Sequence, residues 1–254
     1  MNGVEFITCA LAFYLWHTLG ITIGYHRLLA HRSFKCGKTV EYFFVLAGYL
    51  AFESSPICWI AIHREHHRNA DRSHGPHSPE AGWWDAYIGW MLRIHYSERM
   101  DPEKIAPDLF KDPLYRFLEQ DCNLYRGYAL CAIVCIIFRC LLLIAFGPGV
   151  ALASLLAGVA AQQAPLILGV VAHIPKFGYR NFDVPDKSTN VWWIALITMG
   201  EGWHNNHHAF PSSARSGLMK GEFDLSWCVL KLLHGWGLVS GLKQPHAREC
   251  LTLS

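Results

Sequence analysis

Three apolar stretches of the chain approach the length that crosses a lipid bilayer. They cover residues 4–25, 127–147 and 149–174, and about 20 predominantly apolar residues in a helix span the hydrocarbon core. The second and third stretches meet at Gly147-Pro148-Gly149, a turn signal with room only for a hairpin. The pattern therefore predicts three transmembrane helices, of which the last two are antiparallel.

A fourth apolar run, residues 39–62, is a weaker candidate because Glu41, Glu53 and a Ser-Ser-Pro break interrupt it. Basic residues flank it on both sides, whereas the hairpin turn carries no charge. The positive-inside rule places both basic flanks in the cytoplasm, so the run begins and ends on that side. We expect it to form helices on the membrane face.

These assignments predict one all-α membrane domain over residues 1–254, with an outside N-terminus. The segments 26–126 and 175–254 are then cytoplasmic, and residues 223–239 are expected to form a final amphipathic helix. Arg139 lies within the second span. We expect its long side chain to snorkel toward the lipid head groups.

Composition supports a membrane protein and excludes several other classes. Hydrophobic residues make up 52% of the 254 residues and charged residues 17%, against about 25% charged in soluble domains. The 22 basic and 20 acidic side chains are too balanced to indicate a nucleic-acid partner. The nine Cys are scattered and contain no C-x-x-C pair, so we expect no disulfide framework.

The 15 histidines include three clusters. The motif H-x-x-H-H occurs twice and would arise by chance about 0.05 times in a chain of this composition. Each cluster follows or precedes an apolar segment at its predicted cytoplasmic end, so we expect the three to lie level with one another. The clusters are His26-Arg-Leu-Leu-Ala-His31, His63-Arg-Glu-His66-His67 and His204-Asn-Asn-His207-His208.

Helical spacing predicts how these rings are shared. His63 lies on the same helix face as His66 and His67, while adjacent residues diverge by about 100°, so the adjacent pair could reach two neighbouring metal ions. His26 and His31 diverge by about 140° on an α-helix, which favours the two sides of a cleft over one chelate.

The donor set indicates a two-metal centre. Eight imidazoles are twice the four ligands of a structural zinc site, no Cys lies at ligand spacing, and H-E-x-x-H is absent from the sequence. Imidazole suits iron, copper, nickel and zinc, so the residues alone leave the metal open.

The motifs closely resemble the three histidine boxes of the membrane fatty acid desaturases, and within these the acyl-CoA Δ9 branch and its bacterial members. Residues 20–31, 63–67 and 200–211 carry the boxes, and the match extends to residues 178–182 and 213–217. The resemblance covers nearly the whole chain.

This resemblance implies a di-iron centre held by the eight box histidines and by His173. It also implies the reaction: two electrons from a small donor such as ferredoxin, rubredoxin or a b-type cytochrome, together with O2, convert a methylene pair into a cis double bond. The acyl group could be carried by CoA, by acyl carrier protein or by a glycerolipid. The membrane would be the bacterial inner membrane, or the endoplasmic reticulum of a eukaryote.

Polar residues beside the ligands are expected to orient the imidazole rings through hydrogen bonds to their N–H groups. The candidates are Asp71, His77, Glu201, Asn205 and Asn206.

The chain departs from the family pattern at three places. Gly169 stands where relatives often have an Asn that holds a metal-bound water, and Gly75-Pro76-His77 replaces Asp-Pro-His. The first stretch resembles the second of the family's usual four spans, which predicts either an upstream start or a three-span form.

Three alternative functions remain open at this point. Histidine-rich di-iron hydroxylases use similar boxes, and ligand spacing does not separate hydroxylation from hydrogen removal. A catalytically inactive desaturase relative would keep the same metal ligands. A metal transporter is disfavoured, because its ligands should lie near the middle of the spans.

Overall fold

The computed structural model describes residues 1–72, 82–93, 95–96 and 100–246, and within them the fold is almost entirely helical. The two strands of this part, β1 (Lys35–Cys36) and β2 (Val239–Ser240), form one short antiparallel pair. The all-α membrane class is confirmed. Gly75 and His77, which the sequence singled out, lie outside the described residues.

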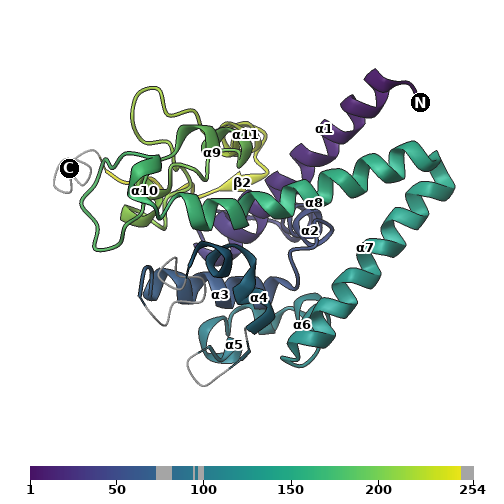
Figure 1. Ribbon diagram of the computed structural model, residues 1–254, viewed down its shortest axis with the longest axis horizontal. Helices are drawn as coiled ribbons and strands as arrows, with labels where there is room; N and C mark the ends of the chain where they lie inside the picture. Colours follow the sequence, from purple (N-terminus) through teal and green to yellow (C-terminus); the bar gives the residue numbers. More distant parts are fainter. Residues whose placement is uncertain (73–81, 94, 97–99, 247–254) are drawn as a thin grey trace.

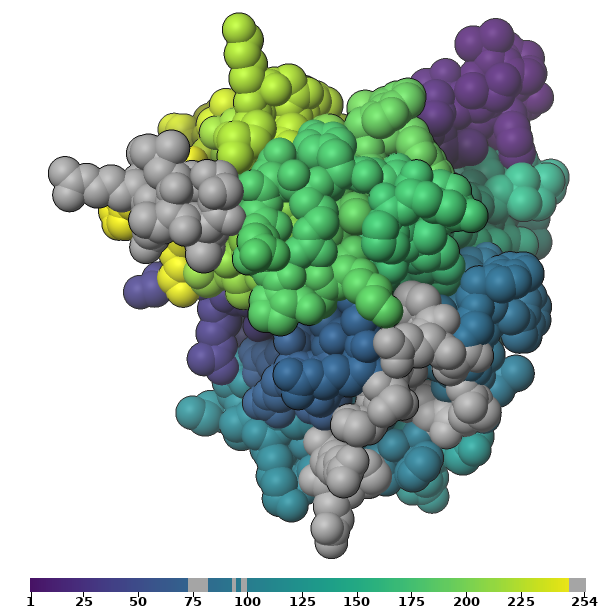
Figure 2. All heavy atoms as spheres, turned by 60° about the vertical axis from the view of Figure 1, so that its left-hand side comes forward, coloured from purple at the N-terminus to yellow at the C-terminus, as the bar shows by residue number. Residues whose placement is uncertain are grey.

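Among the described residues, three helices are long and apolar enough to cross a membrane, as predicted. The first consists of α1 (Gly3–Leu19) and the π-helix η1 (Gly20–Ala30) without a break between them, and the others are α7 (Leu124–Phe146) and α8 (Pro148–Val171). Figure 1 shows that α1 and the α7–α8 hairpin extend together away from the remainder of the molecule. Figure 2 shows the N-terminal end of α1 projecting beyond the rest of the molecule.

The weaker apolar run forms two helices, α2 (Lys38–Tyr49) and α3 (Pro56–Arg68), joined by a turn. Their 12 and 13 residues are too few for either to cross a bilayer. Ser55 begins α3 as its N-cap, and its hydroxyl accepts a hydrogen bond from Cys58 N. α2 packs closely on η1, because a Cβ on Gly20 would collide with the backbone nitrogen of Gly48.

The prediction that Arg139 snorkels to the head groups is wrong. Its side chain is buried, and its guanidinium donates to the carbonyl oxygens of Leu50 at 2.7 Å, Cys135 at 3.2 Å and Ser154 at 3.4 Å. The guanidinium carbon also lies 4.7 Å from the centre of the Phe52 ring. Backbone carbonyls from two neighbouring segments replace water, so Arg139 ties the hairpin to the turn before α3.

The other helices form two groups around α3 and η1. η3 (Asp85–Gly89), α4 (Trp90–Arg93), α5 (Pro102–Ile105), η4 (Leu109–Lys111) and α6 (Pro113–Glu119) connect α3 to α7. η5 (Pro175–Phe177), α9 (Trp192–Ile197), α10 (His204–Ala209) and α11 (Leu225–Gly235) follow α8. The largest core cluster joins the two groups through buried side chains of η1, α2, α3, α6 and α11. This core fixes η1 and α3 against each other.

Candidate metal centre

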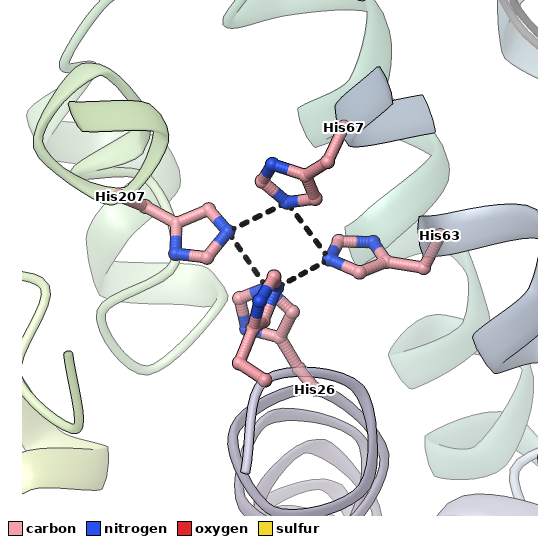
Figure 3. A group of neighbouring side chains, drawn as sticks. His26, His63, His67 and His207 are labelled. Atoms are coloured by element: carbon pink, nitrogen blue, oxygen red, sulfur yellow. Dashed lines mark hydrogen bonds between the residues drawn. The ribbon is translucent and has the colours of Figure 1, made fainter. Parts of the chain in front are cut away.

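Five imidazoles converge on one point where η1, α3 and α10 meet. Their ligand nitrogens all lie within 4.8 Å of one another, and four of the Nε2–Nε2 distances are 2.8–3.1 Å. Figure 3 shows His26, His63, His67 and His207 with their rings directed toward a shared centre. We call this the five-histidine set; its members are His26, His31, His63, His67 and His207.

The expectation that His26 and His31 lie on two sides of a cleft is wrong. Both belong to the five-histidine set, and the reason is the π-helix that carries them. In a π-helix each N–H bonds to the carbonyl five residues earlier, and His31 N donates to His26 O at 3.1 Å. Residues five apart therefore lie on the same face.

A second group of four imidazoles adjoins the first. His173 Nε2 and His208 Nε2 each lie 3.0 Å from His204 Nε2, and His66 completes the group. We call it the four-histidine set. The rings of His67 and His208, one from each set, have centroids 4.7 Å apart.

The adjacent histidines divide between the sets as their helical spacing predicts. His66 belongs to the four-histidine set and His67 to the five-histidine set. His208 and His207 divide in the same way. The structure thus brings all nine histidines named by the sequence into two adjoining groups.

Three carboxylates lie beside the Nδ1 atoms of three of these rings. Glu201 lies 2.6 Å from His26 Nδ1, Asp71 lies 3.0 Å from His173 Nδ1, and Asp186 lies 2.8 Å from His208 Nδ1. A carboxylate at Nδ1 keeps the proton there and leaves Nε2 as the metal-binding lone pair. The sequence singled out Asp71 and Glu201 but missed Asp186, which lies in a loop between two motifs with no local signal.

Buried Arg27 holds Glu201 in place and was also missed. Its guanidinium donates to Glu201 Oε1 at 3.0 Å and to Asp224 Oδ1 at 3.1 Å. Burial alone would raise the pKa of Glu201, but Arg27 and His26 together lower it to about 2. Glu201 is therefore ionised. In the sequence, the one signal for the role of Arg27 was its position directly after His26.

The expectation that Asn205 and Asn206 orient imidazole rings is not supported. Asn205 Oδ1 accepts from the backbone nitrogens of Asn181 and Phe182. The Asn206 amide makes four hydrogen bonds, which is its full capacity. Both side chains fasten neighbouring loops to α10 because they leave the helix at a different angle from His204 and His208.

The chemistry of the two sets suits a metal cation. Burial first, and then the neighbouring rings, holds the pKa of His63, His67, His204 and His207 well below its ordinary value, so these rings are neutral. His173 and His208 both direct Nε2 lone pairs at His204 Nε2, which has at most one proton to offer. A cation between the rings would satisfy the crowded lone pairs.

The number of rings argues against a structural zinc site. Five imidazoles around one point exceed the four ligands of a structural zinc ion.

A cavity borders both histidine sets. His26 and His63 of one set and His66 and His204 of the other lie in its wall. Gly169 also lines it, and Glu53 and Gln162 are among its polar residues. Its apolar lining includes Trp59, Ile62, Ala86, Trp90, Leu166 and Leu168. An apolar chain in this cavity would lie against the place where the two sets meet.

The fold and site define a helical membrane protein with two adjoining histidine sets that could hold metal. The family model described as "Fatty acid desaturase" matches residues 4–238. The chain belongs to this family, and is a fatty acyl desaturase.

Named relatives agree. The chain is 38% identical over 241 residues, 94% of its length and 84% of the relative's, to the sn-1 stearoyl-lipid 9-desaturase of Anabaena variabilis. It is 38% identical over 229 residues, 89% of its length and 76% of the relative's, to the sn-2 palmitoyl-lipid 9-desaturase of Nostoc. Acyl-CoA 5-desaturase AL21 of Anemone leveillei is 39% identical over 229 residues, 89% of this chain and 68% of its own.

Proposed function

We propose that this desaturase introduces a cis double bond at position 9 of a saturated acyl chain, with two iron ions held by its nine clustered histidines. The observation that carries the proposal is the convergence of nine imidazoles into two sets along one apolar cavity. A saturated chain has no polar group to bind, so an apolar wall beside the metal ligands is the feature that recognises it.

Iron pairs of this kind supply the capacity to activate O2 with electrons from a small redox protein. The protein's own groups do the positioning. Glu201, Asp71 and Asp186 keep the protons of three rings on Nδ1 and thereby fix the ring orientations. The apolar lining excludes water from the reacting methylenes and holds them beside both sets.

We infer that the acyl chain is attached to a membrane glycerolipid. The two relatives named for position 9 are named as lipid desaturases, and the acyl-CoA relative is named for position 5. The resemblance of the boxes to the acyl-CoA Δ9 branch is the competing indication. Basic residues flanking the first span and α3 favour a cytoplasmic metal centre, with residues 26–126 and 175–254 on that side.

Expression in a host that lacks Δ9 unsaturated lipids tests the reaction. Gas chromatography–mass spectrometry of total fatty acids should reveal cis-9 monounsaturated chains, and purified protein should contain iron. His67→Ala and His207→Ala should abolish the product, whereas His246→Ala, at an exposed histidine outside both sets, should retain it. Unsaturated product from either of the first two variants contradicts the proposal, and a hydroxylated product indicates a hydroxylase.

The carrier needs a separate measurement. Nanodiscs containing the protein and a reducing system are supplied either with a labelled stearoyl glycerolipid or with labelled stearoyl-CoA. Labelled oleoyl chains should form in the sample with the glycerolipid and not in the sample with stearoyl-CoA. The opposite result would establish acyl-CoA as the substrate.

A further inference from the structure

Residues 191–202 form a loop that leaves the metal centre and returns to it. Val191 N donates to Gly202 O at 2.8 Å, so the two ends of the loop meet. α9 occupies the first half of the loop. His204, the first residue of α10, comes two residues after the loop ends. The loop therefore starts and ends level with the histidine sets.

The far end of this loop contacts the first span below that level. Tyr14 OH donates to the carbonyl oxygen of Ile197 at 2.7 Å. Tyr14 is in α1, twelve residues before His26, and Ile197 is six residues after Val191, a helical rise of about 9 Å. The last residue of α9 thus contacts the side chain of a residue that is expected to lie inside the bilayer.

The outer face of α9 consists of exposed apolar side chains. Trp192 is 62% exposed, Trp193 39%, Leu196 54% and Ile197 38%. On the inner face, Ile194 is buried in a cluster with Leu168 and Ala172. Leu11 and Leu15 of α1, the helix that Tyr14 joins to Ile197, are likewise exposed apolar side chains.

Several polar backbone groups of the turn after α9 have partners within the protein. Gly200 N donates to Ala195 O at 2.7 Å, and Gly202 N donates to Thr198 Oγ1 at 3.1 Å. Met199 O accepts from Ser226 N at 3.0 Å. Irregular backbone at membrane depth is tolerated only where neighbouring protein supplies such partners.

Glycine permits this tight return. A Cβ on Gly202 would collide with the backbone nitrogen of Ala195, and Gly200 has a φ of +118°, which other residues rarely adopt. The return is therefore closed against α9 without leaving a gap that water would have to fill.

We propose that α9 and its turn are a re-entrant segment whose outer face contacts lipid acyl chains. Trp192 and Trp193 lie at head-group depth, where tryptophan is enriched, and Leu196 and Ile197 lie in the hydrocarbon. This refines the expectation that residues 175–254 are cytoplasmic, because part of the segment would then enter the membrane from that side. The inference rests on depth and exposure and is independent of the reaction.

Cysteine labelling in nanodiscs, where both membrane faces are open to solution, tests the segment. Leu196→Cys and Ile197→Cys are treated with a membrane-impermeant maleimide, and labelling is counted above that of the parent chain. Lys220→Cys, on an exposed loop, is the aqueous control, and Ile144→Cys, on the exposed face of α7, is the lipid control.

Both α9 variants should label at least about tenfold more slowly than Lys220→Cys and about as slowly as Ile144→Cys. Each should label fully once detergent unfolds the chain, which shows that the thiol is intact. Labelling of Leu196→Cys and Ile197→Cys at the rate of Lys220→Cys would overturn the proposal. Metal content of each variant reports separately whether the histidine sets have formed.

Discussion

The two histidine sets differ in ring number and in what supports their rings. The five-histidine set takes two rings from the end of the first span and has one carboxylate, Glu201, at an Nδ1. The four-histidine set takes His173 from the end of α8 and has two carboxylates, Asp71 and Asp186. Within the described residues, the set with fewer imidazoles thus has more carboxylates at Nδ1.

This difference predicts that the two sets differ in how well they bind metal after the loss of one imidazole. A carboxylate at Nδ1 makes the ring a stronger donor and fixes its orientation. Four rings leave no surplus ligand if one is removed, whereas five rings still leave four. We therefore expect metal binding in the four-histidine set to depend more strongly on each member.

Removing one ring from each set should have the largest effect. We expect His208→Ala to lose one of the two metal ions and His31→Ala to keep most of both, because four imidazoles remain in its set. Product formation should fall by more than about 100-fold in His208→Ala. Metal analysis of the purified proteins measures the difference, and equal losses in the two variants would show that the sets are equivalent.

Neutralising the carboxylates should have the next largest effect. Asp71→Asn and Asp186→Asn should each weaken metal binding about 10–100-fold, because the ring behind each loses its ionised partner. Competition with a chelator measures the affinity of one site at a time. Asp183→Asn, at a fully exposed neighbour, should leave affinity unchanged; a similar loss there would indicate a general charge effect.

Gly20→Ala should disturb the five-histidine set through its supporting helix. The added methyl group collides with α2 and should destabilise the protein by about 1–3 kcal/mol, with a lower melting temperature. Because His26 lies in η1 and His31 directly follows it, metal should be lost from the five-histidine set first. Gly37→Ala, where a Cβ meets open space at the N-cap of α2, is the matched control and should lower the melting temperature much less.

Glu53→Gln should have the smallest effect at low pH, and one that grows as the pH rises. Burial raises the pKa of Glu53 to about 8, so between about pH 4.5 and 8 the folded chain holds a proton that the unfolded chain has released. Stability from this group therefore falls as pH rises through that window. Glu53 also accepts a hydrogen bond from Trp59, whose ring stacks on His63 of the five-histidine set.

The variant should melt several degrees above the parent at pH 8.5 and much closer to it at pH 5.5. Thermal unfolding in the same detergent at both pH values makes the comparison. A difference that does not change with pH would mean that Glu53 is already ionised in the folded protein.

Local spacing explains what the sequence could predict. Three spans follow from apolar length, and the division of His66 from His67 follows from the angle between adjacent residues on a helix. The same argument failed for the His26–His31 pair because the argument assumed 3.6 residues per turn. The sequence carries no plain signal that η1 is a π-helix.

Contacts between distant segments account for the other errors. Asp186 reaches His208 across 22 residues, and Arg139 reaches the carbonyl of Leu50 across 89. The Asn206 amide forms hydrogen bonds with loops on both sides of α10 rather than with the adjacent rings. Each partner becomes apparent only when the packing of whole elements is known.

The buried guanidinium of Arg139 bears on how the protein is assembled during synthesis. An arginine entering the bilayer in an isolated helix costs about 2.5–3.5 kcal/mol on insertion scales. Its acceptor at Leu50 and its ring partner Phe52 precede it in the chain and leave the ribosome first. The α7–α8 hairpin therefore inserts against a segment already translated, which couples membrane integration to the folding of the turn that leads into α3.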